Sequence, residues 1–245
     1  MTTFLIYGKD STGKSSQLKS ICDASETPII ITTELKNRRL YGLDRMGKMT
    51  DDTPYDVVEP LVLESAPSFK VVPVETFNSM GRAIERILNG QGFDGKQKKY
   101  DTVVIDGISD FPRWTEQVVL QKIREKHPDQ KVIGKGNLAG WAARNNLAAL
   151  PIERLSAWAE VTGANVFITT LITPEYINGE KQGYKVDIQD RIRDKACDVR
   201  IALTKDGRGY FATFEKVPAT SEKGKDEVLV TDGGLFVELS KRKLL

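Results

Sequence analysis

An eight-residue segment near the amino terminus has the composition and spacing of a phosphate-binding loop. Gly8-Lys9-Asp10-Ser11-Thr12-Gly13-Lys14-Ser15 fits the pattern G-x-x-x-x-G-K-[ST] without a mismatch. Glycines let successive backbone N–H groups of such a loop face the phosphates, and the start of the following helix adds further donors. We therefore expect residues 8–16, Ser16 included, to bind a nucleoside triphosphate, with Lys14 on the β- and γ-phosphates and the Ser15 hydroxyl on Mg²⁺.

The flanking residues provide the setting that this motif requires. Residues 4–7 are apolar and predict a short buried strand, and residues 16–21 predict the first turns of a helix. A turn rich in glycine and serine could match the pattern by chance. The order of strand, loop and helix favours the phosphate-binding interpretation.

An aspartate at the end of a second apolar strand is a candidate for the magnesium site. Residues 100–106 form an apolar run that ends in Asp106. In P-loop enzymes an aspartate at this place holds the magnesium shell directly or through water, so we expect Ser15 and Asp106 to hold the metal. Asp101 precedes the strand and should lie at the opposite end of the sheet, whereas Asp110 could cap the next helix.

Hydrolysis also needs a group that orients the attacking water. Glu34 directly follows the apolar residues 29–33. If this strand lies beside the strand of residues 4–7, Glu34 emerges next to the γ-phosphate, where ligands of open α/β sheets collect. A solvated glutamate at the start of a loop is the alternative, and Glu75 is a second candidate by the same logic. We take Glu34 and Lys14 as the catalytic residues.

A third strand ends in two hydroxyl groups. Residues 165–170 finish with Thr169 and Thr170. One of these side chains could donate a hydrogen bond to the γ-phosphate or to the water, and Thr169 is our candidate. Threonine is also an ordinary strand residue, which leaves a purely structural role open.

Composition excludes several classes of protein. Of the 245 residues, 40% are hydrophobic and 29% charged, which is typical of a globular protein, and the net charge of +2 is too small to argue for nucleic acid by itself. No apolar run approaches the ~20 residues of a membrane helix. Cys22 and Cys197 lie far apart and His127 is the single histidine, which argues against a zinc site or a disulfide framework. The first residues enter a strand directly, so we expect no signal peptide and a cytoplasmic protein.

The spacing of apolar runs predicts an α/β fold with a mostly parallel sheet flanked by helices. Strand-length runs alternate with longer helical patterns, as in βαβ units. The expected strands are residues 4–7, 29–33, 71–74, 103–105 and 165–170, and the expected helices are 14–24, 79–89, 112–126, 140–150 and 151–162. The last helix would carry Pro151 in its first turn. Residues 35–68 predict a long excursion after the second strand.

The final third predicts antiparallel hairpins. The pairs are 175–186 around Asn178-Gly179, 199–203 with 210–214, and 228–231 with 235–239. We expect one domain over residues 1–245, with a core of about residues 2–217 and a carboxy-terminal β extension of about residues 197–240.

These residues together resemble the RecA-like ATPases. The order of the phosphate-binding loop, Glu34, Asp106, Thr169-Thr170 and the late hairpins is similar to that family. The similarity is greatest to its short, phage-type AAA domain proteins, which include single-strand-annealing ATPases related to archaeal RecA paralogues. The resemblance covers roughly residues 2–217 and implies a homo-oligomer that hydrolyses ATP. In contrast to full recombinases, we expect no amino-terminal oligomerisation segment or DNA-binding domain here, and therefore neither filament formation nor strand exchange.

The resemblance also implies roles for three further segments. Glu34 would activate water, and residues 107–140 and 173–195 would correspond to the two DNA-binding loops. A basic residue near the late hairpins would reach the ATP of a neighbouring subunit. The matching candidates, among which the sequence gives no choice, are Arg191, Arg193, Lys195 and Lys216.

A basic segment supports binding to nucleic acid. Residues 122–135 carry five Lys or Arg residues and His127, and Trp114 and Trp141 lie on either side. Basic groups that follow phosphates and aromatic rings that stack on bases are what single-strand binding uses. A solvated helix face with two core tryptophans is the alternative, and the resemblance favours DNA.

The leading hypothesis is therefore Mg²⁺-dependent ATP hydrolysis coupled to DNA, mainly single strands, in recombination or annealing, with no membrane partner. A small-molecule or nucleotide kinase is one alternative, in which residues 36–68 with Arg38, Arg39 and Arg45 would form a lid. A nucleotide-dependent switch or a packaging-type ATPase is another.

Overall fold

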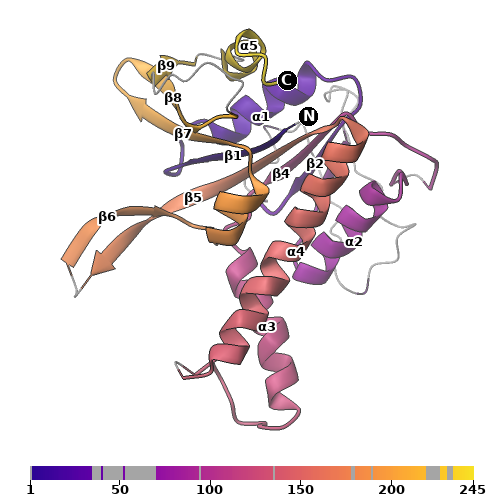
Figure 1. Cartoon of the computed structure of the whole chain (residues 1–245), viewed down its shortest axis with the longest axis vertical. Helices are drawn as coiled ribbons and strands as arrows, with labels where there is room; N and C mark the ends of the chain where they lie inside the picture. The colour runs from indigo at the N-terminus through magenta and orange to yellow at the C-terminus, as the bar shows by residue number, and fades with distance from the viewer. Residues whose placement is uncertain are drawn as a thin grey trace.

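A central sheet covered by helices on both faces forms the body of the molecule (Figure 1). The computed structural model describes residues 2–34, 40, 52, 70–93, 95–134, 136–177, 180–188, 190–218, 227–230 and 234–245. Most of the 35–68 excursion, including Arg38, Arg39 and Arg45, lies outside the described residues, as do Lys135 and the Asn178-Gly179 turn.

The elements follow one another in an alternating α/β order and then change to antiparallel strands. The strands are β1 (Thr3–Gly8), β2 (Pro28–Thr32), β3 (Lys70–Pro73), β4 (Thr102–Asp106), β5 (Asn165–Ile177), β6 (Glu180–Val186), β7 (Val199–Asp206), β8 (Gly209–Lys216) and β9 (Glu227–Leu229). The helices are α1 (Lys14–Asp23), α2 (Phe77–Leu88), α3 (Phe111–Arg124), α4 (Leu138–Thr162), α5 (Gly234–Lys241) and a π-helical turn (Ile192–Ala196).

The strand order places β1 inside the sheet. The order is β3-β2-β4-β5-β1-β7-β8-β9, and β6 pairs with β5 away from this path. The pairs from β3 to β7 are parallel, whereas β7–β8, β8–β9 and β5–β6 are antiparallel. The carboxyl ends of β1, β2, β4 and β5 therefore meet at one edge of the sheet, where ligands of such sheets bind.

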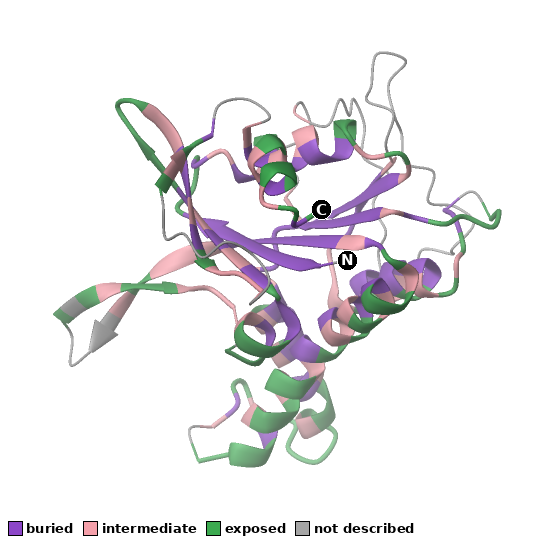
Figure 2. Cartoon of the chain, turned by 45° about the horizontal axis from the view of Figure 1, so that its top comes forward, coloured by how far each residue is buried: buried purple, intermediate pink, exposed green. Residues whose placement is uncertain are grey.

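Alternate residues of each parallel strand pack into two separate cores. Leu5 and Tyr7 face the core that α2, α3 and α4 cover, and Phe4 and Ile6 face the core that α1 and α5 cover. Because both faces are buried (Figure 2), the strands are continuously apolar instead of alternating with polar residues. This pattern explains why the five strands were predictable from apolar runs alone.

Two of the expected carboxy-terminal hairpins are present and the third prediction is wrong. β5–β6 and β7–β8 pair as expected, but residues 234–241 form α5 instead of a strand opposite β9. Leu235 and Leu239 are buried against α1 whereas Val237 is 49% exposed. This spacing of four suits one face of a helix, whereas a strand would turn all three residues to the same side.

The two helices expected over residues 140–162 are one continuous helix. α4 runs through Pro151, which removes one backbone hydrogen bond from its interior. Ala148, Ala149, Ile152 and Leu155, on both sides of the proline, are buried in the core, and this packing offsets the loss. Of the helices that the structure describes, none has the length and apolar character that a membrane crossing requires.

Two hairpins extend beyond the body of the molecule. The α3–α4 pair projects below the sheet and the β5–β6 pair extends to the left in Figure 1. Their outer parts are largely exposed in Figure 2. A small core of Val119, Leu120 and Ile133, with Trp141 packed on it, lies within the α3–α4 pair and is separate from the two main cores.

Candidate nucleotide-binding site

The phosphate-binding loop lies between the carboxyl end of β1 and the amino end of α1. β1 ends at Gly8 and α1 begins at Lys14. A side chain at Gly8 has no space, because its Cβ would lie 2.3 Å from the carbonyl oxygen of Leu203. Gly13 adopts φ 81° immediately before the helix and no side chain caps α1 there, which leaves the first N–H groups of α1 directed into the loop. The loop therefore has the backbone donors that a phosphate needs.

Lys14 lies folded against this loop. Its Nζ donates hydrogen bonds to the carbonyl oxygens of Gly8, at 3.1 Å, and Lys9, at 2.7 Å. The Thr12 hydroxyl donates to the same Lys9 carbonyl at 2.9 Å. Lys14 is only 7% exposed, so its charge is held next to the loop instead of in bulk water. This position suits an ammonium group that pairs with phosphate oxygens.

Ser15, Asp106 and Thr169 meet at one carboxylate oxygen. The Ser15 hydroxyl lies 3.2 Å from Asp106 Oδ1, and the Thr169 hydroxyl donates to the same oxygen at 2.8 Å. Asp106 is fully buried at the end of β4. Hydroxyl and carboxylate oxygens are ligands that Mg²⁺ takes beside phosphate groups, so Ser15 and Asp106 fit a magnesium ion. The sequence predicted this pairing across 91 positions of the chain.

Thr169 contacts the aspartate and not the open part of the loop. It is 1% exposed, and its hydroxyl accepts a hydrogen bond from the Gly107 N–H at 2.8 Å while it donates to Asp106. Thr170 donates to the carbonyl of Asp187 at 2.7 Å and lies 3.2 Å from the Ser109 hydroxyl. The geometry therefore gives Thr169 a role in orienting Asp106.

Glu34 shares a cavity with the phosphate-binding loop. The cavity has a volume of about 290 Å³ and is lined by residues 10–16, Glu34 and Leu40. The sequence argument placed Glu34 near the loop on the condition that β2 lies beside β1. In the structure β4 and β5 separate these two strands. Glu34 reaches the loop across the carboxyl edge of the sheet instead. Glu75, the second candidate, is not among the described residues that line this cavity.

Gly107 lets Glu34 pack closely against the backbone that follows β4. It follows Asp106 with φ 88°, and a Cβ on it would lie 2.8 Å from both Glu34 Cγ and Thr33 Oγ1. The Thr33 hydroxyl donates to the Gly107 carbonyl at 2.6 Å. Only glycine allows this approach without strain. Sequence reasoning missed Gly107, although a glycine directly after the strand-ending aspartate was a visible signal.

The competing aspartates have other partners. Asp101 accepts hydrogen bonds from the N–H groups of Glu26 and Thr27 at the opposite end of the sheet, as predicted. Asp110 occupies the cap position of α3 but makes no capping hydrogen bond with its side chain, and it pairs with Arg113 at 3.1 Å. Asp110 is therefore the cap residue of α3 by position, as the sequence suggested, but its carboxylate makes no capping bond.

Three contacts that the sequence did not predict connect the loop and the helix α1 that follows it to later parts of the chain. The Tyr210 ring lies 3.1 Å from where a Cβ on Gly13 would be. Gln17 on α1 accepts a hydrogen bond from the Leu235 N–H of α5 at 3.1 Å. Lys9 Nζ lies 4.6 Å from the centre of the Tyr184 ring on β6. Both antiparallel hairpins therefore contact the phosphate-binding loop.

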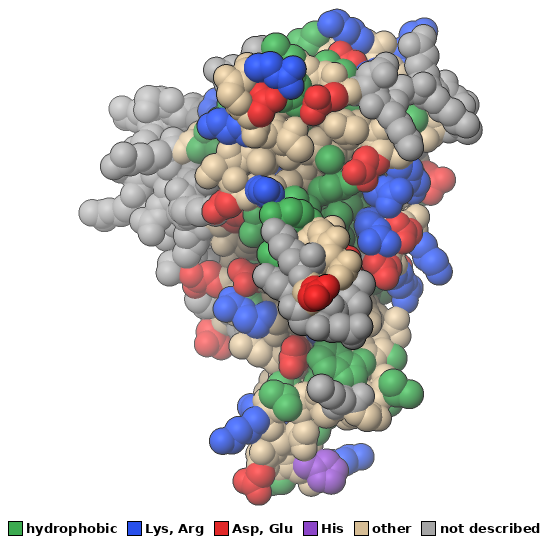
Figure 3. Space-filling view, turned by 90° about the vertical axis from the view of Figure 1, so that its left-hand side faces the viewer, with side chains coloured by type: hydrophobic (Ala, Val, Ile, Leu, Met, Phe, Trp, Pro, Cys, Tyr) green, Lys and Arg blue, Asp and Glu red, His purple; other side chains and the backbone are tan. Residues whose placement is uncertain are grey.

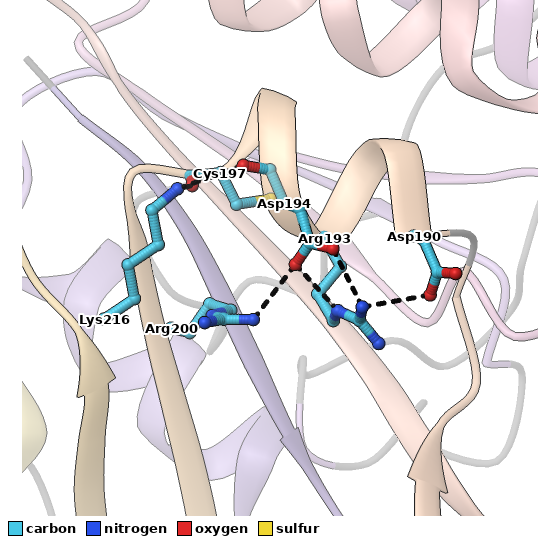
Figure 4. A network of polar contacts seen from close by, with 6 residues as sticks. All are labelled: Asp190, Arg193, Asp194, Cys197, Arg200 and Lys216. Carbon is cyan, nitrogen blue, oxygen red and sulfur yellow. Dashed lines mark hydrogen bonds and ion pairs between the residues drawn. The ribbon is translucent and has the colours of Figure 1, made fainter.

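A network of charged residues lies between the π-helical turn and the strands β7 and β8 (Figure 4). Arg193 forms a two-bond pair with Asp194, and Arg200 also reaches Asp194 at 3.1 Å. The hydrogen bonds from the Arg193 guanidinium hold the pKa of the Asp194 carboxyl below its ordinary value. Lys216 donates to the backbone carbonyls of Asp194 and Cys197.

The four basic candidates for a neighbouring subunit differ in their contacts. Arg191 pairs with Glu153 on α4 and donates to Asn146 at 2.8 Å. Arg193 and Lys216 belong to the network of Figure 4. Lys195 is exposed, and within the described part of the chain it makes no hydrogen bond or ion pair. Lys195 is therefore the candidate whose charge is available to another molecule.

The basic segment lies at the projecting end of the α3–α4 pair, and its two tryptophans differ. Lys122, Arg124, Lys126, His127 and Lys131 are all exposed. Trp114 is 6% exposed and belongs to the main core, as expected if the tryptophans are core residues. Trp141 packs on the small core, and its ring N–H donates a hydrogen bond to the Gly134 carbonyl at 3.2 Å. The Arg144 guanidinium lies above the Trp141 ring.

The comparisons with known proteins agree with this geometry. The sequence matches the family described as "AAA domain" over residues 2–204. A search of curated proteins gave no significant match. Among the solved structures, the crystal structure of the RadB recombinase is similar with a TM-score of 0.52 and 13% sequence identity, covering 95% of this chain and 89% of that chain. This similarity concerns the fold.

The chain belongs to the AAA domain family and is a P-loop ATPase with a RecA-like fold. The predictions of the family, of the mostly parallel sheet and of the nucleotide hydrolase are confirmed.

Proposed function

We propose that this ATPase hydrolyses Mg·ATP in a cycle coupled to single-stranded DNA, in recombination or annealing. The observation that carries the proposal is the cavity of about 290 Å³ in which the phosphate-binding loop faces Glu34. Asp106 lies next to this cavity and accepts a hydrogen bond from the Ser15 hydroxyl. Groups for binding phosphates, holding a metal and orienting water therefore come together at one edge of the sheet.

Each residue of the site has a role that follows from its position. The backbone of residues 8–16 holds the phosphates, and Lys14 exchanges its bonds to the Gly8 and Lys9 carbonyls for phosphate oxygens. Ser15 and Asp106 hold magnesium, which neutralises charge on the phosphates when bound. Thr169 fixes the orientation of Asp106 through their 2.8 Å hydrogen bond. Glu34, packed on Gly107, orients the attacking water.

The DNA part of the proposal rests on the basic end of the α3–α4 pair. Five exposed basic or histidine side chains lie there, and exposed Lys and Arg side chains bind phosphates without sequence preference. The β5–β6 hairpin, which spans part of the second expected DNA-binding segment, contacts the phosphate-binding loop through Tyr184 and Lys9. That contact is a direct route by which DNA on the hairpin affects the ATP site.

Assembly completes the site in this proposal, with Lys195 reaching the ATP of a neighbouring subunit. Completion in trans makes the specific ATPase activity rise with protein concentration. The sharpest test mixes two variants, Lys14→Ala and Lys195→Ala, each of which has low activity alone. A mixed assembly contains sites with an intact loop and an intact Lys195, so activity should return. A mixture as inactive as its components contradicts the role of Lys195.

The first experiment measures steady-state ATP hydrolysis with Mg²⁺, with and without single-stranded DNA, at several salt concentrations. We expect DNA to stimulate turnover and the stimulation to fade as salt rises, because phosphate contacts release counterions. Hydrolysis that is indifferent to DNA at every salt concentration contradicts the coupling and leaves the ATPase assignment intact.

A further inference from the structure

The positive charge of the chain is concentrated in one projecting segment. Residues 118–147, which we call the helical hairpin, contain six Lys or Arg residues and two Asp or Glu residues, whereas the whole chain has 36 and 34. The rest of the chain is therefore net negative. Figure 3 shows Lys and Arg side chains together with hydrophobic ones on this lower end of the molecule.

A cleft with an apolar floor lies between the two helices of the helical hairpin. Its volume is about 470 Å³. Val119 and Ile123 of α3 and Ala143 and Leu147 of α4 contribute to the floor. Ala143 is exposed, and Ile123 and Leu147 are only partly buried. The small core of the helical hairpin thus leaves part of its apolar surface open to water.

The rim of this cleft is cationic. Lys122, Lys126 and His127 line it, and all three are exposed. No carboxylate is among the described residues that line the cleft. Leu138, one residue from the cleft wall, is 78% exposed. An occupant that satisfies both parts of this surface must bring negative charge and apolar side chains together.

The floor does not suit a nucleobase. Bases bind single-strand sites by stacking on exposed aromatic rings. The described residues that line the cleft include no aromatic side chain other than His127 at the rim. Trp114 is in the main core, and Trp141 is covered by the Arg144 guanidinium and bonded to Gly134. Aliphatic surface of this kind packs against the aliphatic or aromatic side chains of a peptide.

We propose that the cleft of the helical hairpin binds an acidic, amphipathic segment of a partner protein. Large apolar side chains of the segment pack on Val119, Ile123 and Leu147, and its carboxylates pair with Lys122 and Lys126. The inference goes beyond the proposed function, because the site takes a protein and needs neither ATP nor DNA. It gives the helical hairpin a recruiting role that adds the apolar floor of the cleft to lysines that the proposed function assigns to DNA phosphates.

The test selects peptides on the folded, full-length protein without nucleotide. A display library of random 16-residue peptides is panned on the wild type, and the recovered peptides are measured against four variants. Ala143→Gln fills the floor without changing charge, and Ala142→Gln is its control on the neighbouring, exposed position outside the cleft. Lys122→Glu with Lys126→Glu reverses the rim, and Lys131→Glu reverses an exposed lysine outside it.

We expect the recovered peptides to combine Asp or Glu with large apolar residues. Their affinity should fall at least about 10-fold for Ala143→Gln and for the rim variant, because each change removes one or more contacts with the peptide. The affinity should be unchanged for Ala142→Gln and Lys131→Glu. Circular dichroism and unchanged thermal unfolding establish that the variants are folded.

Three results overturn the proposal. The first is that no recovered peptide distinguishes Ala143→Gln from Ala142→Gln, and the second is that those which do so lack acidic residues. The third is that Ala143→Gln weakens binding of an oligothymidylate as much as that of the peptides, which assigns the cleft to nucleic acid. None of these results depends on the ATPase cycle, so the failure of this inference is distinct from the failure of the proposed function.

Discussion

The carboxyl edge of the sheet and the helical hairpin hold their own charged side chains in opposite structural settings. At the sheet edge, Lys14 and Asp106 are nearly or fully buried and their positions are fixed by short hydrogen bonds. On the helical hairpin, four basic side chains are exposed around a small separate core, namely Lys122, Arg124, Lys126 and Lys131. A buried group with fixed partners supports chemistry at one point, whereas exposed charges support binding that tolerates many sequences and depends on salt.

This difference has a consequence for mutation. At the sheet edge each residue has several partners, so one substitution disturbs an entire arrangement. On the helical hairpin the charges act nearly independently, and their effects should add. Single substitutions should therefore be severe in the first region and mild in the second.

The largest effect should come from Lys14→Ala. This change removes the ammonium group that is held against the Gly8 and Lys9 carbonyls and that we assign to the phosphates. We expect turnover to fall by about 100-fold or more, as for the loss of other charge-stabilising donors. Calorimetry of ATP binding and steady-state hydrolysis provide the measurement. Lys19→Ala is the control, since Lys19 lies on the same helix and its ion pair, among the described residues, is with Asp23 at the exposed surface. An unchanged ATP affinity in Lys14→Ala contradicts the assignment of the loop.

A second effect contrasts two glycines of the two regions. Gly107→Ala places a Cβ 2.8 Å from Glu34 Cγ in a backbone with φ 88°, so we expect it to cost about 1–3 kcal/mol of stability and to displace Glu34. Gly136→Ala on the helical hairpin would meet no atom of the described residues within 4 Å, and its effect should stay within about 0.5 kcal/mol.

Thermal unfolding and ATP turnover measure both changes. Gly107→Ala should lower turnover while ATP binding persists, because the loop itself is intact. Equal unfolding temperatures and equal turnover for the two variants would remove the distinction between a fixed and a tolerant region.

The sequence predicted the sheet edge well because its chemistry depends on local patterns. The loop of residues 8–15 and the strand-ending Asp106 are each recognisable in a few residues, and their meeting follows from parallel strands. The position of Glu34 was predicted on the condition that its strand lies beside β1, a condition that the strand order does not meet. Thr169 was predicted to face the nucleotide, yet its hydroxyl bonds Asp106 and Gly107, a contact that depends on strand register.

What the sequence did not predict depends on contacts between distant segments. Leu235, Val237 and Leu239 alternate as in a strand, and only the packing of α5 on α1 shows that Val237 is an exposed residue of a helix. Likewise, the same basic residues and tryptophans are consistent with a stacking site and with a solvated helix. Burial of Trp114 and coverage of Trp141 by Arg144 distinguish the two, and both are tertiary facts.

A third effect tests whether the charges of the helical hairpin act independently. The triple variant Lys122→Gln, Lys126→Gln and Lys131→Gln should bind single-stranded DNA about 10-fold more weakly. The slope of log affinity against log salt should decrease in magnitude by about 2. Basal ATP hydrolysis without DNA should not change. Lys96, Lys98 and Lys99 are also exposed, and their replacement by Gln is the matched control for net charge. Equal losses in the two triple variants would mean that DNA responds only to total charge.

The smallest effect concerns the network of Figure 4, in which Asp190 and Asp194 are exposed while Arg193 and Arg200 are half-buried. Hydrogen bonds from Arg193 lower the pKa of Asp194, so the ionised carboxylate is favoured in the folded state. Its stabilising contribution is therefore present above the ordinary pKa of aspartate and is lost as the pH falls through the lowered pKa.

Asp194→Asn should lower the unfolding temperature at pH 7. The change should be slight because solvent screens the pair, and the difference from the wild type should disappear in strong acid. Asp190→Asn, which removes one 3.0 Å contact to the same arginine, should have a smaller effect at pH 7. A difference for Asp194→Asn that is constant from pH 7 to strong acid would assign its effect to packing, and the network would then belong with the uncharged contacts of the fold.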